Sequence, residues 1–382
     1  MGDAGVLDKA NDGSNPSFIL RAVKDVSLSD TDIPKPSITD PYDVIIHVGQ
    51  TGICGSDVHY WQRGRIGDFV LTSPIVLGHE SAGTVVEIGG SVKNLRVGDK
   101  VAIEPGVPCR HCDYCRSDTI FAATPPHNGT LSKYYKTAAD YCYPLPEHMS
   151  LEDGALCEPV AVAVQICKVG NVRAGQTVVV FGCGPIGLLV QCVAKAYAAK
   201  TVIGVDMSQS RMDLAKNVLK CADGVFKTSP MPLPKEEGQA SPAYDADKES
   251  AWSAHVADEI KKTFDLGEGP DVVIDATGAQ SCIQTGINLC KKGGTYVQAG
   301  MGRENVVFPI TTACIRDLTI RGSIRYTAGV YPRAVDLVAS GKIDPKVLIT
   351  HRFPFEKAEE AFETVRKGGE DVLKVIIEGV RN

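Results

Sequence analysis

The order of hydrophobic and polar residues divides the chain into regions of different character. Up to about residue 143, short β-branched runs such as Asp43–Val48 and Gly83–Ile88 are separated by Gly and Pro. Short strands with frequent turn signals are typical of a barrel-like, mostly antiparallel domain. We therefore predict a mostly-β domain in the first part of the chain.

A different pattern begins at Thr177. Thr177–Phe181 is a continuous apolar run, which is typical of a parallel strand buried on both faces, and an Ala-rich stretch over Ile186–Ala199 predicts the helix that follows it. Strands alternating with helices indicate right-handed βαβ units and a doubly wound parallel sheet. The other predicted elements of this region are strands at Val202–Asp206, Asp271–Asp275 and Gly294–Gln298, a helix over Arg211–Leu219 and a helix from Ser281.

Beyond about residue 306 the signals are mixed. Thr319–Ser323 is strand-like and Glu356–Lys367 has the pattern of an amphipathic helix, so this segment could return to complete the first domain. The Pro- and charge-rich stretch Ser229–Ser250 predicts a solvated loop. The fold class is thus α/β, and the predicted domains are residues 1–165, 166–305 and 306–382.

Composition narrows the class of protein. A chain of 382 residues favours two domains, and 43% hydrophobic with 23% charged residues is ordinary for a globular protein. The net charge of −6 provides no basic surface for nucleic acid, and no stretch of about twenty apolar residues predicts a membrane span. Thirteen cysteines without a secretion signal indicate reduced thiols and metal ligands, so we predict a cytoplasmic protein.

One glycine motif predicts a dinucleotide site. It fits G-x-G-x-x-G, directly follows a predicted strand and opens a predicted helix. The first glycine permits the tight turn, the second lets the backbone approach the pyrophosphate, and the third allows the helix to pack closely on the sheet. The candidate cofactor-binding residues of the motif are Gly182, Gly184, Pro185, Ile186 and Gly187.

The next predicted strand ends in an acidic residue, Asp206, about twenty residues after the motif. A carboxylate at this position accepts hydrogen bonds from the adenosine ribose and repels the extra phosphate of NADP, so we predict NAD as the cofactor. Arg211 could pair with such a phosphate or lie over the adenine ring, and with the carboxylate present we favour the adenine.

A mixture of sulfur, nitrogen and oxygen donors predicts a metal site. Cys54 precedes His79 and Glu80, and this ligand mixture suits Zn²⁺ with a fourth position open for water or substrate. Asp57 is the expected acceptor for a ring N–H of His79, which frees the other nitrogen for the metal. His59 is a candidate for moving a proton. A metal site combined with a nicotinamide site indicates alcohol oxidation.

At these residues the chain resembles the zinc-dependent medium-chain alcohol dehydrogenases, most closely the polyol branch that includes sorbitol and xylitol dehydrogenases. The resemblance covers nearly the whole chain after about residue 17. Its most specific stretches are Cys54–Trp61, Gly64–Phe69, Leu77–Gly83, Phe121–Pro126 and Glu158–Pro159. It implies a GroES-like, mostly-β catalytic domain split around a Rossmann coenzyme domain, with the active site in the cleft between them.

The resemblance also implies residue roles at the metal. Zinc would be held by Cys54, His79 and Glu80, with Glu158 bonding the metal-bound water. Glu80 and Glu158 could exchange roles as substrate enters. Simpler alcohol dehydrogenases take a cysteine from the region of Cys157 as third ligand, but we favour Cys157 as a buried neighbour, because adjacent helix residues point in different directions.

Similarity further implies a proton path and a polyol pocket. The proton would leave through Ser56, the cofactor ribose and His59 to water. Arg325 could instead form an ordinary ion pair at the surface or in an interface. The polar candidates for substrate contact are Tyr60, Thr124, Arg325 and Tyr326, and the apolar candidates beside the reacting carbon are Ile66 and Phe121.

One segment departs from the family pattern. Cys109, Cys112 and Cys115 have the spacing of the family's structural zinc lobe, but the fourth cysteine expected about eight residues on is missing. Three cysteines make an incomplete tetrahedral site, and His111 between them would be strained as a substitute. We therefore predict one catalytic zinc and assign no second ion.

These observations lead to one expected reaction and several alternatives. We expect NAD- and zinc-dependent oxidation of a polyol to a ketose, with xylitol to D-xylulose as the first choice and sorbitol or L-arabinitol as alternative substrates. A catalytically silent NAD-binding regulator or structural relative is the alternative from another class. The resemblance implies a homo-oligomer, often a tetramer, whose only other partner is the small-molecule polyol or ketose.

Overall fold

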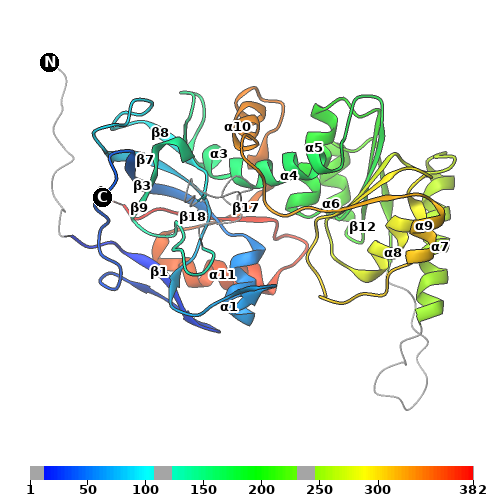
Figure 1. Cartoon of the computed structure of the whole chain (residues 1–382), viewed down its shortest axis with the longest axis horizontal. Coiled ribbons are helices and arrows are strands. Elements are labelled where there is room, and N and C mark those ends of the chain that lie inside the picture. Colours follow the sequence, from blue (N-terminus) through cyan, green and yellow to red (C-terminus); the bar gives the residue numbers. More distant parts are fainter. Residues whose placement is uncertain (1–12, 107–122, 230–245, 382) are drawn as a thin grey trace, which may run out of the picture. The chain divides into compact units, whose positions relative to one another are not determined.

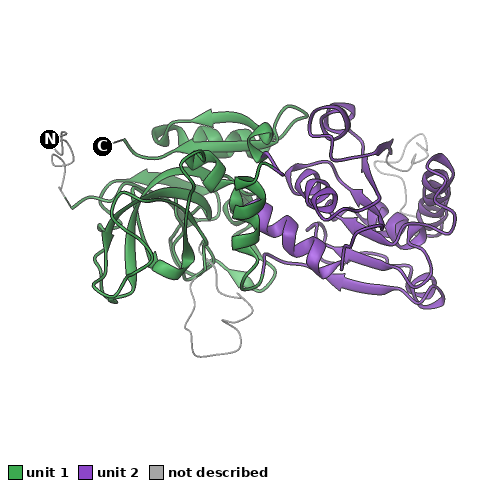
Figure 2. Cartoon of the chain, turned by 90° about the horizontal axis from the view of Figure 1, so that it is seen from above, with its two compact units in different colours: residues 1–158, 327–341, 345–382 green, residues 159–326, 342–344 purple. Residues whose placement is uncertain are grey.

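The computed structural model describes residues 13–106, 123–229 and 246–381. The chain divides into two compact units (Figure 2). The first unit comprises residues 1–158, 327–341 and 345–382, and the second comprises residues 159–326 and 342–344. Within the described ranges, no helix has the length and apolar character needed to cross a membrane.

The first unit is built on a mostly antiparallel seven-stranded sheet. Its strand order is β10-β8-β7-β3-β18-β17, and β9 pairs with β3. Strands β2, β1 and β6 form a separate three-stranded sheet, and β4 pairs with β5. The described strands of the whole unit are β1 (Ser17–Ala22), β2 (Asp25–Ser29), β3 (Asp43–Gly52), β4 (Arg65–Ile66), β5 (Phe69–Val70), β6 (Ile75–Val76), β7 (Glu80–Ile88), β8 (Lys100–Ile103), β9 (Tyr134–Ala138), β10 (Cys142–Pro144), β17 (Ile349–Phe353) and β18 (Lys374–Glu378). The α-helices of the unit are α1 (Gly55–Arg63), α3 (Leu151–Ala155), α10 (Tyr331–Ala339) and α11 (Ala358–Lys367).

The C-terminal strand closes this sheet. Strand β18 pairs antiparallel with β3, so that Ile376 lies opposite Gly52 and Ile377 opposite Thr51. It also pairs in parallel with β17. Strands far apart in the sequence therefore share one sheet, and β18 from the C-terminal segment reaches the region where β3 leads into Cys54.

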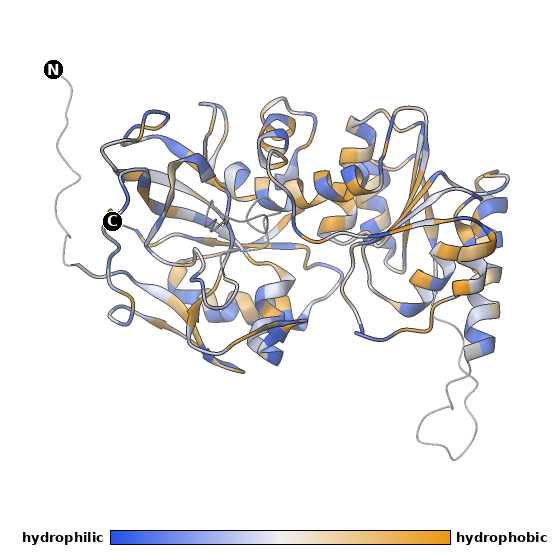
Figure 3. Cartoon of the chain, in the orientation of Figure 1, coloured by the Kyte–Doolittle hydropathy of each residue, from blue (hydrophilic) through white to orange (hydrophobic). Residues whose placement is uncertain are grey.

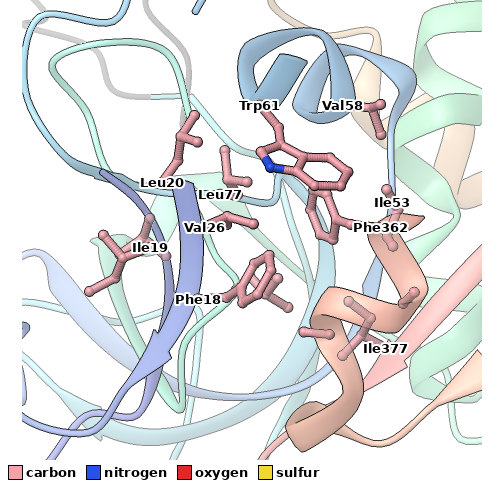
Figure 4. Close-up of a cluster of buried hydrophobic side chains, with 14 of the residues drawn as sticks. Phe18, Ile19, Leu20, Val26, Ile53, Val58, Trp61, Leu77, Phe362 and Ile377 are labelled. Atoms are coloured by element: carbon pink, nitrogen blue, oxygen red, sulfur yellow. The ribbon is translucent and has the colours of Figure 1, made fainter. Parts of the chain in front are cut away.

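A hydrophobic core fixes helix α1 against α11 and β1 (Figure 4). Phe18 lies 5.0 Å from Phe362 between ring centroids, and Trp61 meets Phe362 edge-on at 6.2 Å. Each fully buried aromatic or aliphatic side chain of this kind contributes about 1.5–3 kcal/mol. Because α1 is anchored by Val58 and Trp61, the polar residues on its first turn are held in place.

The second unit contains the predicted parallel sheet, with six strands in the order β13-β12-β11-β14-β15-β16 and every pairing parallel. This confirms the predicted α/β fold class. Its strands are β11 (Thr177–Phe181), β12 (Thr201–Asp206), β13 (Gly224–Lys227), β14 (Val272–Asp275), β15 (Thr295–Gln298) and β16 (Thr319–Gly322). The described helices of this unit are α5 (Pro185–Ala196), α6 (Gln209–Asp213), α7 (Ala246–Thr263), α8 (Gln280–Leu289) and α9 (Ile310–Ile315), and a π-helical turn covers Leu214–Val218. Helix α4 (Cys157–Val169) begins in the first unit and continues in the second.

Alternating side chains of the parallel strands form two buried faces. Val179 and Phe181 of β11 pack into a cluster with Ile260 of α7 and Ile287 of α8. Helix α5 covers β11 and β12 from the other face, and hydrophobic residues run along it and the strands beneath (Figures 1 and 3). Burial on both faces explains why these strands are continuous apolar runs in the sequence.

Two element boundaries differ from those that the sequence predicts. Helix α7 begins at residue 246, inside the stretch 229–250 that was expected to be a loop, because its apolar residues recur at helical spacing from Trp252 onward. Strand β16 pairs with β15, so residues 319–322, beyond the predicted boundary at 305, belong to the parallel sheet.

Candidate metal centre and dinucleotide site

Three predicted ligands lie together in the first unit. Cys54 stands immediately before α1, while His79 and Glu80 lie where the chain enters β7. One ligand atom from each of these three residues lies within 4.8 Å of the others, and His79 and Glu80 are buried. A thiolate, an imidazole and a carboxylate at these separations fit one Zn²⁺ ion with an open coordination position.

Asp57 on the first turn of α1 orients the imidazole of His79. Its Oδ1 lies 3.3 Å from Nδ1 of His79 and also accepts a hydrogen bond from the backbone N–H of Gly78 at 3.4 Å. The other ring nitrogen, Nε2, lies 3.5 Å from Oγ of Ser56. A proton held on Nδ1 by Asp57 would leave Nε2 free to bind a metal, so the position of Asp57 suits the supporting role that the sequence predicts for it.

The electrostatics of His79 couple metal binding to pH. Burial lowers the pKa of His79, but the Asp57 carboxylate and the Cys54 sulfur outweigh burial and raise this pKa well above its ordinary value. A metal ion must displace a proton from a ring in this environment. Zinc affinity should therefore rise with pH.

Glu80 has a cationic partner that the sequence did not reveal. Nζ of Lys374, on β18, donates to Oε1 of Glu80 at 2.8 Å and to Oε2 at 2.7 Å, and both side chains are buried. Burial lowers the pKa of Lys374, but the nearby negative groups, of which the Glu80 carboxylate contributes most, together outweigh burial and raise this pKa above its ordinary value. A Cβ at Gly52 would lie 2.2 Å from Oε2 of Glu80, so only glycine leaves room for this pair.

The predicted dinucleotide motif forms the turn between β11 and α5 in the second unit. Gly182 has φ of 95°, in the left-handed region that favours glycine. A Cβ at Gly187 would lie 1.8 Å from the carbonyl oxygen of Gly182, whereas a Cβ at Gly184 would meet nothing within 4 Å. Pro185 and Ile186 begin the helix after Gly184, so the backbone N–H groups of this end are directed at an open approach.

Asp206 ends β12 beside this turn. Its Oδ2 accepts a hydrogen bond from the backbone N–H of Cys183 at 2.6 Å, and its Oδ1 accepts one from Ser208 at 2.8 Å. Arg211 lies on α6, where its backbone N–H donates to Oγ of Ser208 at 3.4 Å. The carboxylate and the glycine turn are thus joined, as a site for the adenosine ribose and pyrophosphate requires.

Comparison with known proteins shows the family of the chain. The model of the alcohol dehydrogenase GroES-like domain matches residues 40–147, and that of the zinc-binding dehydrogenases matches residues 185–340. A relative named probable D-xylulose reductase A, from Aspergillus clavatus, is 48% identical over 375 residues, which cover 96% of this chain and 98% of the relative. The chain belongs to the zinc-binding dehydrogenases. The first unit therefore carries the GroES-like domain that the resemblance implied.

Two further relatives extend the comparison of this zinc-binding dehydrogenase. D-xylulose reductase A of Aspergillus niger is 46% identical over 373 residues, covering 96% of this chain and 97% of the relative. Among solved structures, the short-chain alcohol dehydrogenase of Escherichia coli CFT073 in complex with NADH is 26% identical, with a TM-score of 0.79, and the match covers 96% of this chain and 99% of that chain.

Cys157 and Glu158 begin helix α4 of the dehydrogenase. The thiol of Cys157 is fully buried and donates to the carbonyl oxygen of Asp153 at 3.3 Å, and burial raises the pKa of this thiol. This fits a buried neighbour that stays protonated. Glu158 is buried but is not one of the three grouped donors, so its bond to the metal or its water stays a prediction.

The residues of the predicted proton path share helix α1. Ser56 is partly buried beside Nε2 of His79, and His59 is half-buried one turn further on. Burial and the nearby charge of Arg63 lower the pKa of His59, so its ring is neutral at physiological pH. A neutral imidazole can accept a proton, as the relay requires.

The predicted substrate residues are distributed over both units. Tyr60 and Thr124 are buried in the first unit, and Ile66 is partly buried in the short β4–β5 hairpin. Arg325 and Tyr326 belong to the second unit, where Arg325 takes the uncommon φ of 48°. Phe121 lies outside the described residues, as do Cys109, Cys112 and Cys115 of the incomplete zinc lobe.

Proposed function

We propose that this dehydrogenase oxidises a polyol to a ketose with zinc and NAD, and that its reaction is xylitol to D-xylulose. The observation that carries the proposal is the grouping of Cys54, His79 and Glu80 in a chain that is 48% identical to a protein named probable D-xylulose reductase A. Sorbitol and L-arabinitol are the alternative substrates.

The chain's own residues account for binding and proton transfer. Cys54, His79 and Glu80 hold the zinc, which, when bound, supplies the Lewis acidity that lowers the pKa of a hydroxyl. Asp57 fixes the imidazole tautomer of His79. Ser56 relays the proton of the reacting hydroxyl by donating its own proton onward as it accepts one, and His59 is the base that receives the relayed proton and passes it to water. NAD is the hydride acceptor, and the protein supplies orientation and electrostatics.

Two glutamates are candidates for the third protein ligand of the zinc ion. We assign Glu80 as the third ligand because it belongs to the donor group, and Glu158 as the residue that bonds the water. The buried ammonium of Lys374 donates hydrogen bonds to both carboxylate oxygens of Glu80 and therefore weakens the bond of Glu80 to a metal. A weakly held Glu80 allows Glu158 to replace it when substrate enters.

NAD in preference to NADP is proposed on the position of Asp206. The carboxylate ends β12 and is fixed by two backbone N–H groups, so a second phosphate at this position meets a negative charge. Replacing Asp206 with Ala should raise KM for NAD and reduce the preference for NAD over NADP by tenfold or more, roughly the strength of a charged hydrogen bond. Steady-state kinetics with both cofactors measure it. Equal efficiency of the unmodified enzyme with both would contradict the assignment.

The direct test of the proposed reaction is an assay of NADH formation. Xylitol, sorbitol, L-arabinitol and ethanol are supplied in turn, with and without a zinc chelator. We expect the highest kcat/KM on xylitol and loss of activity with the chelator. Highest activity on sorbitol or arabinitol would reassign the substrate, and NADH binding without turnover of any alcohol would favour a silent relative.

We also propose a cytoplasmic homo-oligomer, a tetramer by family resemblance. All ten cysteines that the structure describes are free thiols, which suits a reducing compartment. Strand β16 is the outer strand of the parallel sheet, and all its residues are exposed, including Ile320. Pairing with a second copy would cover this edge. Light scattering on the purified enzyme measures the assembly. Limited proteolysis tests the domain boundaries, which the sequence predicts at residues 165 and 305, whereas the compact units divide after residues 158 and 326.

A further inference from the structure

A fully buried carboxylate at the end of β14 has no part in the reaction described above. Asp275 is not exposed at all, yet it accepts four hydrogen bonds. Its Oδ1 accepts from the backbone N–H of Thr277 at 3.1 Å and from its Oγ1 at 2.6 Å. Its Oδ2 accepts from the backbone N–H of Gly278 at 2.8 Å and from Nε2 of Gln298 at 2.6 Å.

These bonds join two turns that follow neighbouring strands. Gln298 ends β15, and its Nε2 also donates to the carbonyl oxygen of Gly300 at 2.8 Å. The backbones of the two turns are in close contact. A Cβ at Gly300 would lie 2.3 Å from the backbone nitrogen of Gly278, and a Cβ at Gly302 would lie 2.0 Å from the carbonyl oxygen of Gly278. Asp275 therefore fixes two glycine-containing turns as one surface.

This surface adjoins the dinucleotide turn. A Cβ at Gly182 would lie 2.9 Å from Cγ2 of Thr277, and the N–H of Ala276 donates to the carbonyl oxygen of Phe181 at 2.9 Å. In an open parallel sheet, ligands bind beyond the carboxyl ends of the strands, where the strand order reverses. Here the order reverses between β11 and β14, so both turns lie at this edge.

The strand order also assigns the half of the dinucleotide that these turns meet. Asp206, which reads the adenosine ribose, is on β12, and the pyrophosphate turn follows β11. Strands β14 and β15 lie on the opposite side of β11 from β12. A dinucleotide extending along this edge past the pyrophosphate must therefore place its nicotinamide half against the turns fixed by Asp275.

We propose that Asp275 is a positioning residue for the nicotinamide half of the cofactor: it holds the turns at Thr277–Gly278 and Gly300–Gly302 in the shape that the nicotinamide ribose and ring contact. The inference rests on the proposed use of NAD. Asp275 touches neither cofactor nor substrate and acts through backbone. Burial raises the pKa of its carboxyl, while the four donors favour the ionised form.

Three substitutions test the role. Asp275→Asn replaces one acceptor oxygen with an amide that donates, and Thr277→Val removes one donor while keeping the side-chain shape. Thr277→Ser restores the hydroxyl. As a control, Ser253→Ala removes the hydroxyl of a fully buried residue in the same unit, outside the two turns, where it donates to Oε1 of Gln284 at 3.2 Å. Thr277→Val keeps the test available if Asp275→Asn does not fold.

The readout compares NADH with AMP, which contains only the adenosine half. Titrations of the zinc-loaded enzyme should show the dissociation constant of NADH raised about tenfold in Asp275→Asn and Thr277→Val, the effect of losing a hydrogen bond to a charged group. The dissociation constant of AMP should change less than about twofold. Thr277→Ser should bind NADH more tightly than Thr277→Val, and Ser253→Ala should keep the NADH-to-AMP ratio of the unmodified enzyme.

Three results would overturn the inference. One is an unchanged affinity for NADH in both variants. Another is an equal weakening of NADH and AMP, because a general structural role would affect both halves of the cofactor. An unmodified enzyme that binds AMP and NADH equally well, with no contribution from the nicotinamide half, would reject the positioning role and the proposed use of NAD together.

Discussion

The imidazole of His59 is half-buried on helix α1, and burial together with Arg63 lowers its pKa below the ordinary 6.5. The base form is the one that accepts a proton, so it is already present at neutral pH. In the unmodified enzyme the rate of alcohol oxidation should therefore rise with pH along a limb centred below 6.5 and then level off.

Replacing His59 with Gln removes this base. We expect at least a tenfold loss of kcat near pH 6 to 7, since positioned bases contribute about 10²–10⁴-fold, and a smaller loss at high pH where hydroxide can take the proton. The pH profiles of kcat for both enzymes, measured with saturating NAD, provide the check. A profile that keeps its shape in the variant would reject the relay through His59.

Lys374 and Glu80 form a buried ion pair next to the metal donors. Replacing Lys374 with Met leaves the Glu80 carboxylate buried and unpaired, so the metal-free protein should lose about 3–5 kcal/mol of unfolding free energy. Urea denaturation of metal-free protein measures the loss, and Lys374→Arg, which keeps the cation, serves as the control. Added zinc should recover part of the loss, because the metal supplies a new partner for Glu80.

A Lys374→Met protein as stable as the unmodified one, both without metal, would show that this pair does not hold Glu80.

The ion pair between Lys374 and Glu80 also explains why the sequence predicted only part of the site. Cys54, His79, Glu80 and Asp57 could be predicted because their residue types and local spacing suit zinc and its supporting shell. Lys374 carries no such signal: it meets Glu80 only because β18 pairs with β3, and pairing between distant strands is not written in any local pattern.

At the scale of elements, the turn between β11 and α5 is the feature most fully dictated by residue type. Gly187→Ala would place a methyl group 1.8 Å from the carbonyl oxygen of Gly182, so the cofactor-free protein should lose about 1–3 kcal/mol of unfolding free energy. Gly184→Ala meets no protein atom within 4 Å and should cost less than about 0.5 kcal/mol. Its methyl group would instead point to where the pyrophosphate approaches, and weaken NADH binding.

Denaturation without cofactor and NADH titration together separate these two glycines. A Gly187→Ala protein as stable as the unmodified one, or a Gly184→Ala protein that binds NADH normally, would contradict these roles of the two glycines.

The helices and strands of the second unit show what hydrophobic patterning can predict. Strand β11 has the predicted bounds because its apolar run is buried on both faces. Helix α7 begins inside the predicted loop, because a Pro- and charge-rich composition masked the start of a helix whose apolar residues begin later.

At the scale of the whole molecule, the sequence predicted two kinds of domain because their hydrophobic periods differ. The irregular β-rich runs gave the sheet that contains β3 and β7, and the strand–helix alternation gave the parallel sheet. The sequence could not predict that β16 pairs with β15 and extends the parallel sheet, because a short exposed strand has no hydrophobic pattern that assigns it to one sheet or another. The strand order, which brings Asp275 beside the dinucleotide turn, likewise becomes visible only in the folded chain.

The proposed chemistry requires that Cys54, His79 and Glu80 bind one and the same catalytic ion. Titrating the metal-free protein with Co²⁺, whose bond to a thiolate absorbs light, tests it most directly. We predict that one equivalent restores NADH formation from xylitol together with a thiolate-to-cobalt absorption band that changes when xylitol is added, and that Cys54→Ser abolishes both. A Cys54→Ser protein that keeps the xylitol-sensitive band and the activity would show that Cys54 does not bind the catalytic ion.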